Sequence, residues 1–239
     1  MLNSVVKRTM RRLGFDLRRY RSATSEAAQF MGMLSAHGIN LVFDVGANTG
    51  QFGKFLRDNG YGGRIVSFEP LSKAREQLLE ASQKDSLWEV APRAAIGSED
   101  GEIEIHVAAN SASSSVLNML EAHASAAPQS RYIGSERVPL RRLDSIALDY
   151  LTSDSVTFLK LDTQGYEDRV LLGAPELIGK TVGLQLEMSM VSLYEGQLLF
   201  GDMVNKLKAN GFEIWAIWQS FIDSRNGRLL QADVTFFRY

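Results

Sequence analysis

The sequence predicts an α/β fold, in which helices cover both faces of a mostly parallel sheet. Short apolar runs at residues 40–45, 64–68 and 88–91 alternate with stretches whose apolar residues recur at helical spacing. This alternation is typical of β-α-β units, which place consecutive strands parallel to one another. The chain has 239 residues and no cysteine, so we expect one domain with its own core and neither disulfides nor thiolate zinc sites.

The N-terminal elements are bounded by a capping residue and by glycines. Ser25 can cap a helix that runs to Ala36 and ends before Gly38. The elements that follow are, in order, a strand over residues 40–45, a helix ending at Asn59 and Gly60, a strand over 64–68, a helix over 71–82 and a strand over 88–91.

After residue 96 the regular alternation pauses. Residues 103–107 alternate apolar with polar side chains, as in a half-exposed strand, and residues 108–130 are rich in Ala and Ser without a period, as in a functional loop or lid. The remaining predicted elements are a short strand over 138–143, a helix capped by Asp144, a buried strand over 156–161, a short helix within 165–173, a strand over 182–186, a helix over 200–210 and a hairpin of 212–217 with 234–239.

The first 21 residues are strongly basic. They carry a net charge of +6, which leaves −8 for the rest of a chain whose total is −2. Apolar residues recur among the cations at three- and four-residue steps, namely Leu2, Val5, Val6, Met10, Leu13 and Leu17. We therefore expect an amphipathic helix, which either contacts an anionic membrane surface or glycolipid or packs its apolar stripe on the domain.

The composition also bears on partners and location. The acidic remainder lacks basic patches interleaved with aromatic residues, so no nucleic-acid partner is expected. No apolar run is long enough for a membrane-spanning helix, and the start lacks the apolar core of a signal peptide. We expect a cytoplasmic protein, peripheral to the inner face of the membrane if residues 1–21 bind lipid. The sequence indicates no particular oligomeric state.

The turn after the first predicted strand has the features of a nucleotide-binding turn. In the run FDVGANTGQ at residues 43–51, Gly46 and Gly50 let the backbone turn tightly and approach a ligand. Glu69 ends the second strand 19 residues after Gly50, where a carboxylate can accept hydrogen bonds from both hydroxyls of a ribose. The spacing predicts a cofactor that contains adenosine.

The residues beside these glycines distinguish between adenosine cofactors. A nicotinamide dinucleotide fingerprint has glycines where this chain has Asn48 and Gln51. Asp44 would repel a pyrophosphate, whereas its charge suits the ammonium group of S-adenosylmethionine. The turn therefore favours S-adenosylmethionine over a dinucleotide.

Further motifs follow the turn along the chain. They are DVGANTG at 44–50, FEP at 68–70, AAIG at 94–97, DG at 100–101, SSS at 113–115, LDSI at 143–146, LKLDTQGYE at 159–167 and LLGA at 171–174. Together they resemble the FkbM family of S-adenosylmethionine-dependent methyltransferases, from about residue 39 to the C-terminus. Gln164 departs from the pattern, because the family usually has glutamate there.

The resemblance implies a Rossmann-like class I methyltransferase domain at residues 39–239, after a basic helical segment at 1–38. Its sheet would have seven mostly parallel strands and an antiparallel C-terminal hairpin. By position, Asp44 would meet the ammonium group of the cofactor and Glu69 its ribose. The implied cofactor-binding residues are Asp44, Gly46, Asn48, Gly50, Glu69, Pro70, Ala94, Ala95 and Asp162.

Methyl transfer to a hydroxyl needs a base that takes the hydroxyl proton. Asp162 and Glu187 each end an apolar strand at the edge where such sheets bind ligands, and a close second carboxylate raises a pKa toward that of a working base. Asp162 is the first candidate, its alternative role being to cap a helix over 163–172. His123 is an alternative base if the Ser/Ala-rich segment closes as a lid.

Other polar residues are candidates for holding the acceptor. The candidate substrate-binding residues are Ser113, Ser114, Gln164 and Tyr194. Asp162, Glu187 and Gln164 also present oxygens of the kind that ligate a divalent ion such as magnesium, but the sequence does not favour a metal.

The function that the resemblance implies is O-methylation. The acceptor implied by the resemblance is a hydroxyl of a sugar in a glycan, a glycolipid or a glycosylated metabolite. One alternative is N- or O-methylation of a peptide or a small natural product, which the same sheet could support with other loops. The other is a non-catalytic, cofactor-binding scaffold in a glycan assembly complex.

Overall fold

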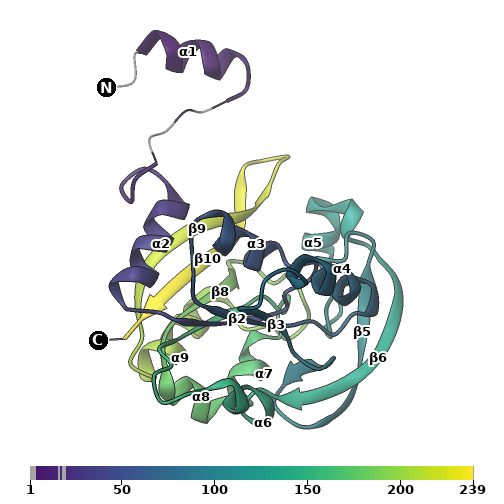
Figure 1. The fold of residues 1–239 in the computed structure, drawn as a ribbon. Helices are drawn as coiled ribbons and strands as arrows, with labels where there is room; N and C mark the ends of the chain where they lie inside the picture. The colour runs from purple at the N-terminus through teal and green to yellow at the C-terminus, as the bar shows by residue number, and fades with distance from the viewer. Residues whose placement is uncertain (1–3, 16, 18–19, 239) are drawn as a thin grey trace.

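A seven-stranded sheet runs through the protein (Figure 1), whose computed structural model describes residues 4–15, 17 and 20–238. The strand order is β3-β2-β1-β7-β8-β10-β9, and within this sheet β10 runs antiparallel to both neighbours. The strands are β1 (Leu41–Val45), β2 (Arg64–Phe68), β3 (Trp88–Val90), β7 (Thr157–Leu161), β8 (Thr181–Ser189), β9 (Glu213–Asp223) and β10 (Arg228–Phe237). The predicted sheet with its antiparallel hairpin is thereby confirmed, although Leu2 and Tyr239 lie outside the described residues.

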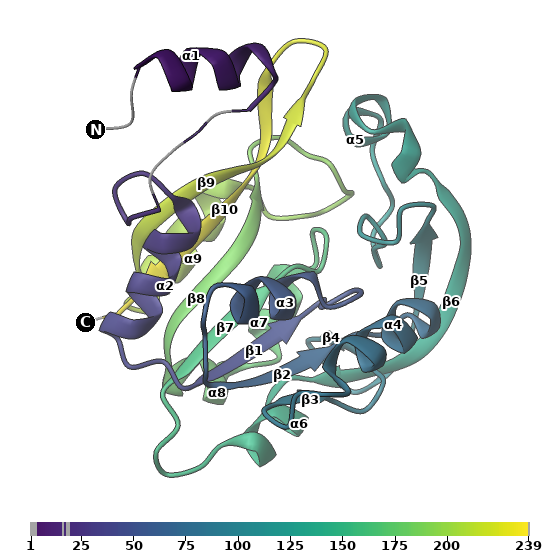
Figure 2. The same ribbon diagram turned by 45° about the horizontal axis from the view of Figure 1, so that its top comes forward.

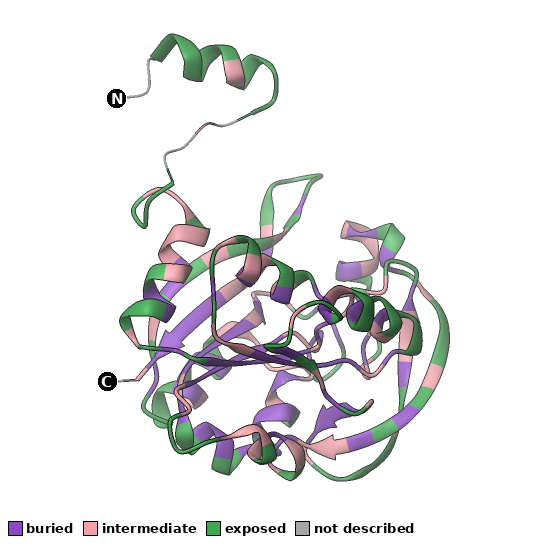
Figure 3. Ribbon diagram, viewed as in Figure 1, coloured by how far each residue is buried: buried purple, intermediate pink, exposed green. Residues whose placement is uncertain are grey.

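Helices cover both faces of this sheet. One face carries α2 (Glu26–Ala36), α3 (Gln51–Asp58) and α4 (Ser72–Ser82), and the other carries α6 (Asp144–Ala147), α7 (Glu167–Leu172), α8 (Pro175–Lys180) and α9 (Phe200–Ala209). Because side chains alternate across a strand, Val42 belongs to the core cluster that contains Phe30 of α2, whereas Phe43 belongs to the cluster that contains Leu207 of α9. The strands between the two helical layers are accordingly buried (Figure 3).

A second sheet, which the sequence does not predict, flanks the first. It has the order β4-β6-β5 and consists of β4 (Ala95–Gly97), β5 (Gly101–Ala108) and β6 (Tyr132–Arg142). Ile105 and Val138 of this sheet pack against Leu71 and Ala74 at the start of α4. The segment 108–130, expected to be a loop or lid, includes α5 (Glu121–Ala126) and a 3-10 turn at Pro128–Ser130. In Figure 2 these elements form one edge of the protein, beyond α4.

The two halves of the N-terminal segment behave differently. No residue of α1 (Ser4–Arg12) is buried, so its apolar stripe does not pack on the domain (Figure 3). In contrast, α2 is capped by Ser25, as predicted, and buries Phe30, Met33 and Leu34 in the core. None of the helices in the described part of the chain combines the length and apolar content needed to cross a bilayer.

Two local predictions need correction. Asp144 does not cap the helix that follows it: its carboxylate accepts hydrogen bonds from the backbone N–H groups of Glu176 and Leu177, both at 2.9 Å, at the start of α8. The strands β6, β8, β9 and β10 are also longer than predicted. The strands are predicted from runs of apolar residues, and such runs leave out polar residues. Some of these polar residues are nevertheless buried within the strands, such as Gln231 in β10.

Candidate active site

A pocket opens at the carboxyl ends of β1, β2 and β7. Its far wall comes from the second sheet and the segment that follows β5. Among the residues that line it are Gly46, Asn48, Glu69, Pro70, Ala94, Ala95, Ser111, Ser114, Asp162 and Gln164. Ligands bind at this edge of α/β sheets, and the pocket thus brings together most of the predicted cofactor-binding residues.

The glycine turn fits tightly against the end of β7. Gly46 has φ +82°, and a Cβ placed on it would lie 1.9 Å from the backbone carbonyl oxygen of Asp162. Asn48 also has a positive φ, of 47°, and its backbone N–H donates to Oε2 of Glu69 at 2.8 Å. Only a glycine at position 46 leaves room for the close approach to Asp162. The second glycine, Gly50, lies outside the pocket lining, at the N-cap of α3 with φ +83°.

Glu69 lies at the end of β2 against an apolar wall. Its other oxygen, Oε1, accepts a hydrogen bond from the backbone N–H of Leu71 at 2.9 Å, and burial raises its pKa to about 7. Phe68, Ala95 and Ile96 provide apolar surface beside it. A carboxylate next to a narrow apolar slot fits a ribose and its attached planar base.

A second, acidic hollow lies on the other side of Gly46. Asp44, at the end of β1, is buried and accepts a hydrogen bond from Ser67 Oγ at 3.3 Å. Burial, together with the nearby charge of Asp162, raises the Asp44 pKa to about 7, although Lys160 acts against this rise. A carboxylate placed here suits a cationic ligand group.

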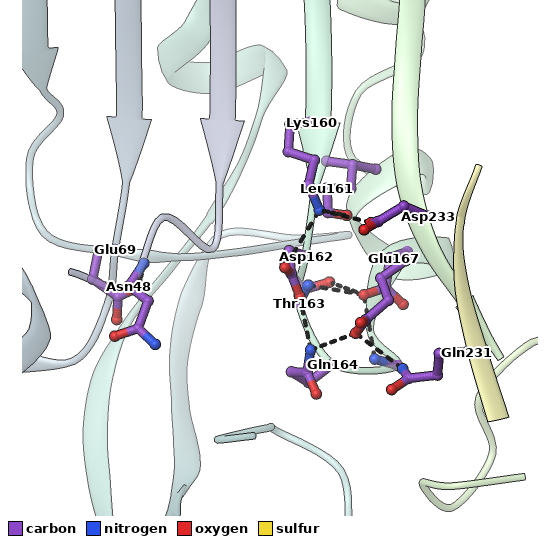
Figure 4. A network of polar contacts seen from close by, with 12 residues as sticks. Asn48, Glu69, Lys160, Leu161, Asp162, Thr163, Gln164, Glu167, Gln231 and Asp233 are labelled. Atoms are coloured by element: carbon purple, nitrogen blue, oxygen red, sulfur yellow. Dashed lines mark hydrogen bonds and ion pairs between the residues drawn. The ribbon is translucent and has the colours of Figure 1, made fainter. Parts of the chain in front are cut away.

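Lys160 is a buried cation that the sequence prediction did not include. Its Nζ lies 3.3 Å from Asp162 Oδ2 and 3.7 Å from Asp233 Oδ1 (Figure 4). The neighbouring carboxylates outweigh the effect of burial and raise its pKa, so it stays charged. A sequence signal was available, because Lys160 stands between Leu159 and Leu161 in an otherwise apolar strand. Buried lysines are almost always paired with an acidic residue, so this lysine indicates a buried ion pair.

The two candidate bases, Asp162 and Glu187, are joined by Gln164. Gln164 Nε2 donates to Asp162 Oδ1 at 2.7 Å and to Glu187 Oε2 at 2.8 Å. Gln231 Nε2, from β10, also donates to Glu187 Oε2, at 3.0 Å, and Figure 4 shows Asp162, Gln164 and Gln231 in this network. Burial and the nearby charges of Asp162 and Asp233 raise the Glu187 pKa to about 8. The structure thus joins the two carboxylates through one amide: Asp162 lines the cofactor pocket, and Glu187 lies on the other side of the Gln164 amide, outside the pocket lining.

The loop that carries Asp162 and Gln164 is held by Glu167. Its Oε1 accepts hydrogen bonds from the backbone N–H of Thr163 at 2.8 Å and of Gly165 at 3.3 Å. The helix that follows, α7, begins only at Glu167, so Asp162 is not its N-cap. This leaves the Asp162 carboxylate directed at Lys160 and Gln164.

The predicted substrate-binding residues separate into two groups. Ser114 and Gln164 line the pocket. Ser113 instead bonds to Ser130 Oγ at 3.0 Å, and Tyr194 is fully buried, with its hydroxyl donating to Gln164 Oε1 at 2.8 Å. Ser113 and Tyr194 therefore support the site from behind rather than line it.

His123 lies away from both hollows. It is buried in α5, where its ring packs 5.1 Å from that of Tyr194 and 5.2 Å from that of Phe221, measured between centroids. Burial lowers its pKa to about 4, so it is neutral at physiological pH. The structure gives this histidine a packing role under Tyr194, and the proposed role as a lid base has no geometric support.

The metal alternative also lacks a suitable arrangement. In the described ranges, no three His, Cys, Asp or Glu side chains are grouped so that they could hold an ion. Between Asp162 and Glu187 stands the amide nitrogen of Gln164, which donates hydrogen bonds, whereas magnesium requires oxygen ligands.

This combination of features defines a class of protein. A seven-stranded sheet with one antiparallel strand carries a glycine turn after β1, an acidic residue after β2 and a carboxylate after β7. These are the features of a Rossmann-like methyltransferase, and the slot beside Glu69 with the acidic hollow beside Asp44 fits the nucleoside and the cationic part of S-adenosylmethionine.

Comparison with known proteins identifies the family. Residues 44–214 match the methyltransferase FkbM domain, so the chain belongs to the FkbM family and is an S-adenosylmethionine-dependent methyltransferase. A relative among characterised proteins is the 2-O-methyltransferase NoeI of Sinorhizobium fredii. It is 27% identical over 167 residues, which are 66% of this chain and 67% of that protein.

Solved structures resemble the fold more distantly. TehB from Haemophilus influenzae is 11% identical with a TM-score of 0.47, and the match covers 88% of this chain but only 62% of TehB. A putative S-adenosylmethionine-dependent methyltransferase from Listeria monocytogenes is 10% identical, also with a TM-score of 0.47, over 88% of this chain and 96% of that one.

Proposed function

We propose that this protein transfers a methyl group to a hydroxyl of a sugar in a glycan, a glycolipid or a glycosylated metabolite. The observation that carries the proposal is Asp162, which lines the cofactor pocket and is joined through the amide of Gln164 to a second carboxylate, Glu187. A sugar hydroxyl is a poor nucleophile while protonated, so its methylation requires such a proton acceptor. The 2-O-methyltransferase activity named for the relative NoeI supports an oxygen acceptor.

The residues of the two hollows would hold the cofactor. Asp44 would pair with its ammonium group, Glu69 would accept from both ribose hydroxyls, and Pro70, Ala94 and Ala95 would contact the adenine. When bound, S-adenosylmethionine supplies a methyl carbon on a positively charged sulfur, which leaves as a neutral thioether with the bonding electron pair. The carboxylates of this region also provide a negative field that favours the bound cation.

The chain's own contribution to the transfer is positioning and proton acceptance. Asp162 lies at the boundary between the two hollows, with its Oδ1 held by Gln164 and its Oδ2 near Lys160. An acceptor hydroxyl beside this pair would give its proton to a carboxylate oxygen as the new carbon–oxygen bond forms. Holding the acceptor in line with the methyl carbon accounts for most of the rate that such a site provides.

The polar groups of this region suit a neutral polyol. Amides and carboxylates line it, and Lys160, the one cation among the described residues that line the two hollows, is already paired with Asp162 and Asp233. Vicinal hydroxyls can donate to the carboxylates, whereas a uronate or phosphate next to the reacting hydroxyl would be repelled. We therefore expect a neutral sugar ring as the acceptor.

The direct test is methyl transfer to defined acceptors. The purified protein is incubated with S-adenosylmethionine carrying a labelled methyl group and with neutral deoxyhexosides, hexosides, a glucuronide and a serine-containing peptide. We expect the label on a neutral glycoside, with one added methyl mass. Label on the peptide alone would support the alternative acceptor, and a stoichiometric cofactor complex with no transfer to any acceptor would support the scaffold alternative.

We also propose that α1 lies on an anionic lipid surface at the inner face of the membrane. Lys7, Arg8, Arg11 and Arg12 fall on one side of the helix, while Val6 and Met10 fall on the other. Val6 is 45% exposed, and no residue of α1 is buried. Cations attract anionic headgroups, and the apolar face gains by entering the interface. A lipid-carried glycan would then be brought near the site.

A further inference from the structure

We infer that Gln164 is a positioning residue, whose amide holds Asp162 and Glu187 together as a pair of proton acceptors while Tyr194 fixes the orientation of that amide. The inference rests on the proposed function and deepens it, because it names the groups that keep the carboxylate pair in its working arrangement. It also changes the expected role of Gln164 from substrate binding to support of the two carboxylates.

Gln164 uses each polar atom of its side chain within the protein. Its Nε2 donates to Asp162 Oδ1 and to Glu187 Oε2, and its Oε1 accepts from the Tyr194 hydroxyl at 2.8 Å. Its backbone carbonyl accepts from Ser115 Oγ at 2.7 Å. These contacts hold the backbone of Gln164 at φ +54°, a left-handed conformation that a non-glycine residue adopts only with support.

The orientation of the amide follows from the chemistry of its partners. An ionised carboxylate can only accept hydrogen bonds, so the nitrogen of the amide must face Asp162 and Glu187. The oxygen is then turned toward Tyr194, whose hydroxyl donates to it. Tyr194 cannot easily move, because its side chain is fully buried and packs on the ring of His123. The tyrosine therefore selects the orientation that presents both amide hydrogens to the carboxylates.

The charged surroundings of Glu187 show why such a donor is needed. Asp162 and Lys160 face it from the β7 side, Asp233 and Gln231 face it from β10, and Tyr194 lies nearby. Burial and the charges of Asp162 and Asp233 raise the pKa of Glu187. The Lys160 charge and the Gln164 hydrogen bond act against this rise, and the net pKa is about 8. With a pKa of about 8, Glu187 is mostly protonated at neutral pH even with the amide present, and loss of the amide would raise this pKa further, so that still less of the ionised form remains to accept a proton.

The titration of Glu187 tests the inference without any acceptor. Protein labelled with ¹³C at glutamate carboxyl carbons is titrated by NMR, and the Glu187 signal is assigned from its absence in Glu187→Gln. In Gln164→Met, which removes the donors with little change of volume, we expect the Glu187 midpoint to rise by about one pH unit. Tyr194→Phe should move it in the same direction by less, because the amide keeps its nitrogen but loses its fixed orientation.

A control variant and a second route complete the experiment. Tyr61→Phe is the matched control, because it removes a buried hydroxyl that has no hydrogen-bond partner in the described structure, and the Glu187 midpoint should not change. If Gln164→Met does not fold, Tyr194→Phe, which leaves the amide in place but removes the hydroxyl that orients it, still tests the inference through its smaller upward shift.

The outcomes separate this inference from the proposed function. An unchanged Glu187 midpoint in a folded Gln164 variant overturns the positioning role, even if the wild-type protein methylates sugars. Failure to methylate any sugar overturns the proposed function, yet it leaves the titration result standing. Where an acceptor is found, the positioning role also predicts that the acid limb of the kcat profile of Gln164→Met moves to higher pH, with little change in the affinity for S-adenosylhomocysteine.

Discussion

The main chains of Gly46 and Asp162 lie against each other beside the cofactor pocket: a Cβ on Gly46 would lie 1.9 Å from the backbone carbonyl oxygen of Asp162. The contact joins the turn after β1 to the loop after β7, and the backbone N–H of Asp162 also donates to the carbonyl of Val45 at 3.0 Å. The two halves of the proposed site are thus fixed relative to each other by backbone rather than by side chains.

Replacing Gly46 by alanine should disrupt both halves. The new Cβ clashes with backbone, which cannot rotate away, and φ +82° is unfavourable for alanine. We expect the free energy of unfolding to fall by about 3 kcal/mol or more and the affinity for S-adenosylhomocysteine to fall at least about tenfold, corresponding to about 1.4 kcal/mol. Chemical denaturation and calorimetry measure these changes.

A matched glycine provides the control for that substitution. Gly179 lies in α8 with open space around its Cα and no positive φ, so Gly179→Ala should leave stability unchanged or slightly higher. Equal stability and cofactor affinity in Gly46→Ala and Gly179→Ala would show that the contact between Gly46 and Asp162 is unimportant.

Asp162 should be needed for turnover much more than for cofactor binding. In Asp162→Asn the side chain keeps its size but loses the charge that accepts a proton, so we expect kcat to fall at least about a hundredfold. The affinity for S-adenosylhomocysteine should stay within a few fold. Asp149→Asn, at an exposed position, is the control and should match the wild type. Unchanged turnover in Asp162→Asn would remove this residue from the proton-accepting pair.

The cofactor-free protein should be less stable at pH 8 than at pH 5.5. Burial raises the pKa values of Asp44, Glu69 and Glu167 to about 7, above their values in the unfolded chain. The folded state therefore binds more protons than the unfolded state between about pH 4 and pH 7, and the free energy of unfolding falls as the pH rises through this window. Urea denaturation at the two pH values measures the difference.

The same carboxylates predict the control for the pH experiment. Glutamine does not titrate, so Glu69→Gln should show a smaller loss of stability between pH 5.5 and pH 8. S-Adenosylhomocysteine should bind more tightly at pH 8, because ionised Asp44 and Glu69 pair with its ammonium and ribose hydroxyls. A free energy of unfolding that rises over this pH range would contradict the burial of these groups.

The N-terminal helix should bind vesicles that contain phosphatidylglycerol but not vesicles of phosphatidylcholine alone. Each cation near an anionic surface contributes about 1 kcal/mol, so Lys7→Gln with Arg8→Gln should weaken binding by about tenfold or more, and added salt should do the same. Val6→Gln tests the apolar face, and Lys208→Gln, an exposed cation on α9, is the control. Equal flotation of all variants with both vesicles would rule out this contact.

The sequence predicts the main sheet and the cofactor side of the site well, for a physical reason. Gly46, Glu69 and Asp162 each follow an apolar strand within a few residues, and parallel strands bring their carboxyl ends to one edge. Local pattern alone therefore places them near one another, and the structure finds all three around one pocket.

The rest of the site depends on contacts that local pattern does not contain. From the antiparallel strand β10, Gln231 contacts Glu187 and Asp233 contacts Lys160. Both residues lie before the apolar run from which this strand was predicted, so the prediction did not include them. Likewise, the direction of Tyr194 and the burial of His123 are set by packing between α5 and the loop after β8. Parts of β5 and β6 are predicted as strands, at 103–107 and 138–143, but local pattern does not say which sheet a strand joins, and β4 has only three residues.

The measurement that tests the central claim most directly is calorimetric titration of the purified protein with S-adenosylhomocysteine and, in parallel, with NADH. The arrangement of Asp44, Gly46 and Glu69 predicts micromolar binding of one S-adenosylhomocysteine per chain, weakened at least about tenfold in Gly46→Ala, and no binding of NADH. Binding of NADH with equal affinity, or no heat with S-adenosylhomocysteine, would contradict the assignment of these residues to the methyl donor.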